Sequence, residues 1–170
     1  MKLTFKNDTF KILQIADTQE GRKVSPDTLA LISAALDREE PDLVVYSGDQ
    51  IWGRGFHGDV NQVRRVLKEL TAPVVERHLP FAICFGNHDR QVGLDNRAQF
   101  EIYKEIPGFI GEDTPGVDGV GNCVLEIADG DRPGYLLYLI DSHSSLKVGY
   151  DHVHQNQIDW YRGVRDSYEK

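Results

Sequence analysis

Three short apolar segments alternate with two amphipathic helical patterns along the first ninety residues of the chain. The apolar segments are residues 10–16, 43–47 and 81–85, and each reads as a buried β-strand. The helical patterns fill the two intervals between them. A strand–helix–strand–helix–strand order with about 30 residues per step is typical of right-handed βαβ crossovers in a parallel sheet. We therefore predict an α/β fold built on a βαβαβ parallel sheet.

The helical patterns carry start and stop signals. Ser25 is suited to cap the first helix, Pro26 to its first position, and Pro41 to end it. In the second helix Pro73 is expected to break or kink the chain. Further on, the sequence predicts a helix over 96–106, a β-hairpin with strands 123–128 and 135–140, and a final helix after residue 154. These helices are expected to flank the sheet.

Each predicted parallel strand is followed by polar side chains. Asp17 follows the first strand and Asp49 the second, and the third leads into the sequence Gly-Asn-His-Asp at 86–89. Because the carboxyl ends of parallel strands meet at one sheet edge, Asp17, Asp49 and Asn87 with His88 are expected in one crevice. Gly, Asn and Asp are also ordinary turn residues, which is the plainer interpretation of any one of these segments. Their recurrence at three strand ends favours a site.

The charge and hydropathy of the chain exclude some classes of partner. The 170 residues carry a net charge of -8, which argues against a nucleic-acid-binding groove or a patch for anionic membranes. Residues 1–9 are polar and do not resemble a signal peptide, and no apolar run reaches the length of a membrane span. We expect a cytoplasmic protein, and the sequence predicts no oligomeric state.

These motifs resemble those of the calcineurin-like metallophosphoesterases. The family's ordered motifs are Asp-x-His, Gly-Asp, Gly-Asn-His-Asp/Glu, a later His and Gly-His-x-His. Here the first reads Asp17-Thr18-Gln19, the second Gly48-Asp49, and the third lies at 86–89. Gln157 followed by Trp160 is similar to the branch related to purple acid phosphatases. The resemblance implies the first half of the family's α/β sandwich.

The resemblance also implies roles for the matching residues. Such enzymes hold two divalent metal ions about 3.5 to 4 Å apart, which grip the phosphate oxygens. By this match Asp49 would bridge both ions, Asp17 and Gln19 would complete the first ion, and Asn87 would complete the second. His88 would be no ligand but a catalytic residue that stabilises or protonates the leaving oxygen, and Asp89 is assigned with it to the catalytic group.

Two departures from the family pattern narrow this expectation. Gln19 stands where the family has a histidine, and its amide oxygen favours Mn or Mg over Zn or Fe. Trp52 stands where the Ser/Thr protein phosphatases carry the aspartate that orients the catalytic histidine. That branch is therefore disfavoured, although Arg54 remains a candidate phosphate contact.

The later histidine motifs of the family are absent. The family draws these ligands and a second sheet from residues that would follow Lys170, so residues 1–170 are expected to be one metallophosphoesterase domain lacking its carboxyl-terminal part. His143, at the end of a predicted strand, and the pair His152 and His154 are candidate replacements. Each has an alternative interpretation as a hydrogen-bonded or solvated loop residue.

Two functional hypotheses follow. The first is a metal-dependent hydrolase of phosphoesters, either monoesters or diesters, with a phosphorylated small molecule or other phosphoester as substrate and with this chain incomplete, weakly active or inactive. The second is a non-catalytic module of the same fold that binds a metal or a partner. Gln19 and the missing histidines favour the second hypothesis, whereas Asp49, Asn87 and His88 favour the first.

Overall fold

The computed structural model describes residues 2–53 and 55–168, and it confirms the α/β fold class. Its elements are, in order, β1 (Leu3–Thr4), β2 (Ile12–Ile15), α1 (Pro26–Glu39), β3 (Leu43–Tyr46), α2 (Val60–Glu76), β4 (Phe81–Ile83), the 3-10 turn η1 (Asp89–Val92), α3 (Asn96–Lys104), β5 (Cys123–Asp129), β6 (Arg132–Leu139) and α4 (Gln155–Tyr168). The predicted βαβαβ unit is β2 to β4 with α1 and α2, and the predicted hairpin is β5 and β6.

The first sheet has the order β2-β3-β4, and all its strands are parallel. All four residues of the central strand β3 are buried. Val44 and Tyr46 belong to the core under the helices, whereas Leu43 and Val45 belong to a second core on the opposite face. Because successive side chains of a strand alternate between faces, β3 is covered on both sides.

The second sheet has the order β1-β5-β6 and covers that opposite face. β1 runs parallel to β5, and β5 and β6 are antiparallel. The sequence predicts the hairpin of β5 and β6 within the chain but not its pairing with β1, so part of a second sheet forms within residues 1–170. Its strand β1 was missed because only Leu3 in a polar segment is buried, and its partner lies far along the chain.

Two local predictions need correction. The hairpin turn is shorter than the expected six residues, because the strands extend to Asp129 and Arg132 and leave Gly130 and Asp131 to turn the chain. Gly130 has a φ of 60°, which suits a glycine. Helix α2 does not end at Pro73 but continues to Glu76. Buried side chains lie on both sides of the proline in α2, so their packing compensates for its missing N–H.

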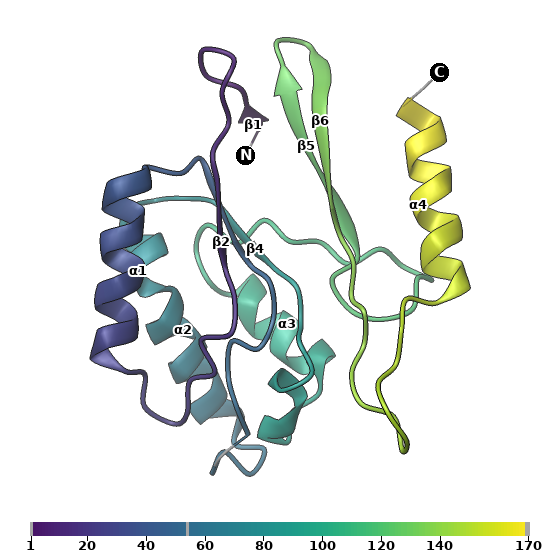
Figure 1. The fold of residues 1–170 in the computed structure, drawn as a ribbon. Helices are drawn as coiled ribbons and strands as arrows, with labels where there is room; N and C mark the ends of the chain where they lie inside the picture. The colour runs from purple at the N-terminus through teal and green to yellow at the C-terminus, as the bar shows by residue number, and fades with distance from the viewer. Residues whose placement is uncertain (1, 54, 169–170) are drawn as a thin grey trace.

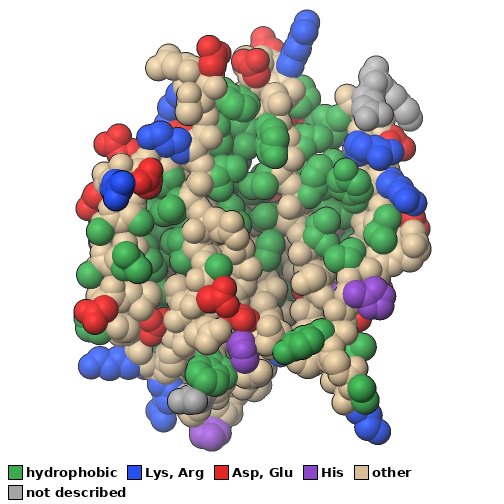
Figure 2. Space-filling view, viewed as in Figure 1, with side chains coloured by type: hydrophobic (Ala, Val, Ile, Leu, Met, Phe, Trp, Pro, Cys, Tyr) green, Lys and Arg blue, Asp and Glu red, His purple; other side chains and the backbone are tan. Residues whose placement is uncertain are grey.

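The layers of the molecule can be followed in Figure 1. Helices α1 and α2 lie on one side of the parallel sheet, and the hairpin and then α4 lie towards the other. Tyr138 of β6 packs edge-on against Trp160 and Tyr161 of α4, with ring centroids 6.0 and 4.8 Å apart. Apolar side chains also gather on the viewed face between β2 and the hairpin (Figure 2). None of the described helices combines the length and apolarity required to cross a bilayer.

Candidate metal centre

The chain segments that follow β2 and β3 continue side by side beyond the strands. The N–H groups of Asp17, Gln19 and Glu20 donate to the carbonyls of Gly48, Asp49 and Gln50 at 3.1, 2.9 and 3.0 Å. Asp17, Gln19 and Asp49 have φ values of 56°, 45° and 54°, in the left-handed region that non-glycine residues rarely adopt. Strained backbone of this kind is held in place only by its surroundings and is concentrated at functional sites.

Asp89 links the second motif to the third through hydrogen bonds. It is 1 % exposed, and its carboxylate accepts four backbone N–H bonds of 2.7 to 3.1 Å, from Asp49, Gln50, Ile51 and Gly86. Burial raises the pKa of Asp89 to about 6, and the nearby Asp49 charge acts in the same direction, although the N–H donors partly offset both. This carboxylate fixes the two loops relative to each other.

The carboxylate of Asp49 sits tightly against the third motif. Its Oδ1 accepts the N–H of His88 at 2.8 Å. A Cβ atom at Gly86 would lie 2.2 Å from the same oxygen, so only glycine allows this approach. Asp49 is largely buried, and its position is set by backbone contacts on both sides.

A cavity of about 280 Å³ opens at this place between the two sheets. Asp49 and Asn87 line one wall, and His143, Ser144 and Asp151 line the other. Ser144 also donates its hydroxyl to the carbonyl of Asn87 at 3.3 Å. The cavity thus brings the loops after β3, β4 and β6 together.

The structure does not bring the other predicted residues into this cavity, since Asp17, Gln19 and His88 are not among the residues that line it. Asp17 is exposed and lines a hollow next to α1 instead, while Gln19 and His88 are half-buried. Arg54 lies outside the described residues. We refer to Asp17, Gln19, Asp49 and Asn87 as the oxygen-donor centre.

His88 has two neighbours that sequence reasoning did not assign to it. Its Nδ1 lies 3.0 Å from Oε1 of Gln91, and its ring meets Trp52 edge-on with centroids 5.7 Å apart. Gln91 follows His88 by three residues in the turn η1, and a spacing of three is the only signal in the sequence that could have suggested the contact. Gln91 therefore orients the ring of His88. The Ser/Thr protein phosphatases use an aspartate for this task, and Trp52 stands at the position of that aspartate in this chain.

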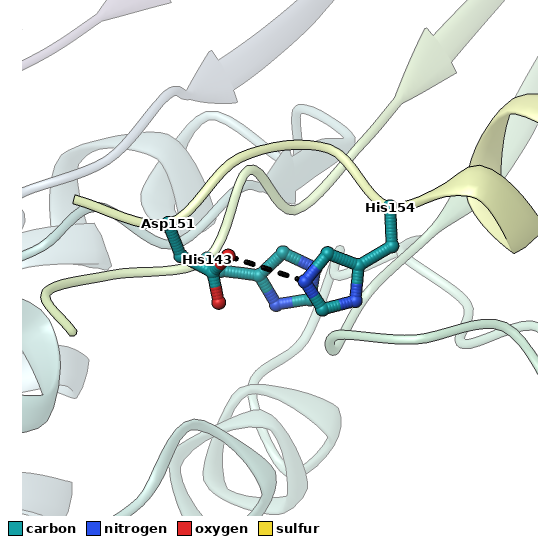
Figure 3. A group of neighbouring side chains, drawn as sticks. All are labelled: His143, Asp151 and His154. Carbon is teal, nitrogen blue, oxygen red and sulfur yellow. Dashed lines mark hydrogen bonds and ion pairs between the residues drawn. The ribbon is translucent and has the colours of Figure 1, made fainter.

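The 142–154 loop places three metal-capable side chains together. One ligand atom from each of His143, Asp151 and His154 lies within 4.8 Å of the others. Figure 3 shows the three side chains gathered together. We call these three residues the histidine cluster. Hydrogen bonds with the carboxylates of Asp118 and, to a smaller extent, Asp151 raise the pKa of His154. The neighbouring His152 is exposed.

The family of the chain follows from its similarity to known proteins. The model of the calcineurin-like phosphoesterases matches residues 10–168. The chain belongs to the calcineurin-like phosphoesterase family. Members typically bind divalent metals, and the carboxylate and amide oxygens of the oxygen-donor centre are ligands of the kind that hard divalent ions take.

Curated relatives come from fungi, plants and bacteria. Phosphatase DCR2 of Saccharomyces cerevisiae is 31% identical over 92% of this chain and 32% of its own length. Probable inactive purple acid phosphatase 14 of Arabidopsis thaliana is 28% identical over 94% of this chain and 48% of its own length. Phosphodiesterase YaeI of Escherichia coli is 35% identical over 55% of this chain and 34% of its own length. The chain thus spans between a third and a half of the length of these relatives.

Proposed function

We propose that this chain carries the amino-terminal ligands of a phosphoester hydrolase with a dinuclear metal centre. The observation that carries the proposal is the placement of Asp49. Its carboxylate is fixed by His88 and by the Asp89-anchored loop, and it lines a cavity shared with Asn87. A carboxylate held in this way is suited to bridge two cations. Its side chain is already ordered, so little further conformational entropy is lost when the cations bind.

The remaining ligands are proposed from the family match. Asp17 and Gln19, whose N–H groups donate to the carbonyls of Gly48 and Asp49, would complete one ion and Asn87 the other. All of these donors are oxygens, which favours Mn or Mg over Zn or Fe. When bound, the two ions supply charge neutralisation at the phosphate and an activated water.

His88 is the proposed general acid. With Oε1 of Gln91 facing Nδ1 at 3.0 Å, that nitrogen keeps its hydrogen. The imidazolium form of the ring, which carries a second hydrogen on Nε2, would then give that second proton to the leaving oxygen. Asp89 belongs to the same motif, but both its oxygens face buried backbone N–H groups. We therefore propose that Asp89 positions Asp49 and His88 and does not touch the substrate.

The proposed substrate is a phosphorylated small molecule or another phosphoester. Relatives named as a phosphatase and as a phosphodiesterase support both a monoester and a diester. The cytoplasmic location expected from the sequence stays a prediction.

A second candidate function is a non-catalytic module that binds metal or a partner. It is favoured by Gln19, which stands where the family has an imidazole ligand, and by three Arabidopsis relatives whose names describe probable inactive purple acid phosphatases. The two candidates share the oxygen-donor centre and differ in turnover.

Calorimetry with Mn²⁺ tests the centre itself. We expect Asp49→Asn to weaken Mn²⁺ binding about 10- to 100-fold or more, because the bridging charge is lost. His88→Ala should leave Mn²⁺ affinity unchanged, since no ligand is removed. An affinity that Asp49→Asn does not alter would overturn the assignment of the site.

Hydrolysis of alkyl phosphates and nitrophenyl phosphate, each as monoester and diester, then separates the two candidates. For a hydrolase, His88→Ala should lower turnover of alkyl esters by about 10²- to 10⁴-fold. The loss should be smaller for nitrophenyl esters, whose leaving group departs without a proton. A wild-type chain that binds Mn²⁺ but hydrolyses none of these esters would favour the non-catalytic module.

A further inference from the structure

The histidine cluster is assembled by the 142–154 loop, which folds back on itself after β6. Ser145 and Tyr150 form an antiparallel bridge, and Asp151 donates its N–H to the carbonyl of Ser144 at 2.8 Å. This return brings Asp151 and His154 beside His143, although both follow it at some distance along the chain. The rings of His143 and His154 stack with centroids 4.1 Å apart and an interplanar angle of 24°.

A buried glutamine decides which nitrogen of His143 can bind a cation. Gln157 is 0 % exposed, and its Nε2 donates to Oδ1 of Asn122 at 2.9 Å and to the carbonyl of Asp141 at 2.6 Å. Its Oε1 is therefore an acceptor, and it accepts the N–H of His154 at 2.7 Å. The same oxygen lies 3.0 Å from Nε2 of His143, which must carry a hydrogen. In the neutral ring, Nδ1 then holds the lone pair.

His154 is oriented by two carboxylates. Its Nδ1 lies 2.8 Å from Oδ2 of Asp118, and its Nε2 lies 3.2 Å from Oδ1 of Asp151. Figure 3 marks the contact with Asp151 by a dashed line. A carboxylate that accepts the hydrogen on one imidazole nitrogen leaves the other nitrogen for a metal, and this pairing accompanies most metal-ligating histidines. Asp118 is this supporting carboxylate for His154, and Nε2 of His154 faces the other residues of the cluster.

We propose that Nδ1 of His143, a carboxylate oxygen of Asp151 and Nε2 of His154 bind a divalent transition-metal ion of the zinc class. Two imidazoles and one carboxylate are a donor set that suits Zn²⁺, and three protein ligands leave its fourth position open. His143 and Asp151 line the same cavity as Asp49 and Asn87, so this position faces the oxygen-donor centre. The ion is a different one from those of the proposed function, and neither proposal depends on the other.

The geometry requires only a small closure of the loop. Ligand atoms around a tetrahedral zinc ion are about 3.3 Å apart, whereas one ligand atom from each of the three cluster residues lies within 4.8 Å of the others. Residues 145–150 of the loop are exposed and can follow this movement, whereas Gln157 is anchored in the core. Binding should therefore tighten the loop and leave the helix in place.

Zinc calorimetry on the 170-residue chain tests the site, in an Asp49→Asn background that disables the oxygen-donor centre. We expect one Zn²⁺ per chain, and about 10- to 100-fold or more weaker binding after His154→Gln or His143→Gln. His78→Gln is the matched control, because His78 is exposed, lies outside the cluster and lines a different hollow beside Pro41; it should bind Zn²⁺ like its parent. Equal affinity in all variants would overturn the proposal.

Nitrogen spectroscopy of the wild-type chain provides a test that does not require any variant to fold. With ¹⁵N-labelled histidine, added Zn²⁺ should shift Nδ1 of His143 and Nε2 of His154 towards metal-bound values, while the other nitrogen of each ring keeps its hydrogen. Shifts at Nε2 of His143, or at His152 alone, would refute the assignment.

Discussion

The oxygen-donor centre and the histidine cluster are assembled in different ways. Backbone bonds between parallel segments hold Asp17 and Asp49, and the buried Asp89 locks them to the third motif. Side chains around Gln157, in contrast, hold the histidine cluster on an exposed loop. The first arrangement is fixed by secondary structure and the second by a polar network. The oxygen-donor centre is therefore rigid and offers hard oxygen ligands, whereas the histidine cluster offers softer imidazole ligands on a loop that is able to move.

The largest effect that would test this contrast is expected from Asp89→Ala. The change leaves four backbone N–H groups without their acceptor in a buried place, which should lower the free energy of unfolding by about 3 kcal/mol or more. Urea denaturation measures it. Asp131→Ala, in the exposed hairpin turn, is the control and should change the free energy by less than about 0.5 kcal/mol. Similar values for both variants would remove Asp89 as the anchor.

A smaller effect is expected from Gly86→Ala. Its new methyl group would meet Oδ1 of Asp49 at 2.2 Å, so the loop must shift at a cost of about 1 to 3 kcal/mol. Thermal denaturation should show the loss, and Mn²⁺ binding should weaken with it. Gly163→Ala is the matched control in α4, where a Cβ meets nothing within 4 Å; it should stabilise the protein by about 0.5 to 1 kcal/mol. A stable Gly86→Ala variant with normal Mn²⁺ binding would contradict the tight packing.

Gln157→Ala should affect the two regions unequally. It removes the acceptor of His143 and the donor to Asn122, which should cost about 1 to 2 kcal/mol of stability. Zn²⁺ binding should fall, and Mn²⁺ binding should remain, because the oxygen-donor centre does not contact Gln157. Gln155→Ala, an exposed change on the same helix, should alter neither. Parallel loss of both metals would show that the two regions are one coupled site.

The smallest effect is expected at the tip of the 142–154 loop. Leu146 and Val148 are 53% and 86% exposed, so the double change to serine should alter the free energy of unfolding by less than about 0.5 kcal/mol. Calorimetric melting measures it. A clear destabilisation would mean that the tip is packed and that the loop cannot close around an ion as easily as proposed.

The same contrast explains what the sequence could predict. The βαβαβ unit and the places of Asp17, Asp49 and 86–89 follow from local signals: apolar strands, a capping serine and polar residues at strand ends. The histidine cluster depends on a loop that turns back and on Gln157, a residue buried by contacts distant in sequence. No period in the sequence pairs His143 with His154. The backbone pairing of the segments after β2 and β3 was therefore predictable. The sequence offers His143 and His154 as candidates, but their meeting with Asp151 depends on side-chain contacts and was not predictable.

β1 and Pro73 show the same limit within the fold. β1 is too short to give an alternating pattern and exists because β5 pairs with it. Pro73 is a reliable local signal that the packing of α2 overrides. In both cases the deciding contacts come from elsewhere in the chain.

The pairing of Leu3 with Ile127 also has a consequence for the order of folding. Contacts between residues far apart in sequence form slowly, because a long loop must close before they contribute. The strands β2 to β4 lie within residues 12 to 83, and the core under their helices also includes residues 85 to 106, whereas the second sheet needs β5 and β6. Asp49 and Asn87 are therefore synthesised before His143 and Asp151, which line the same cavity. During synthesis the groups on one side of the cavity precede those that close it.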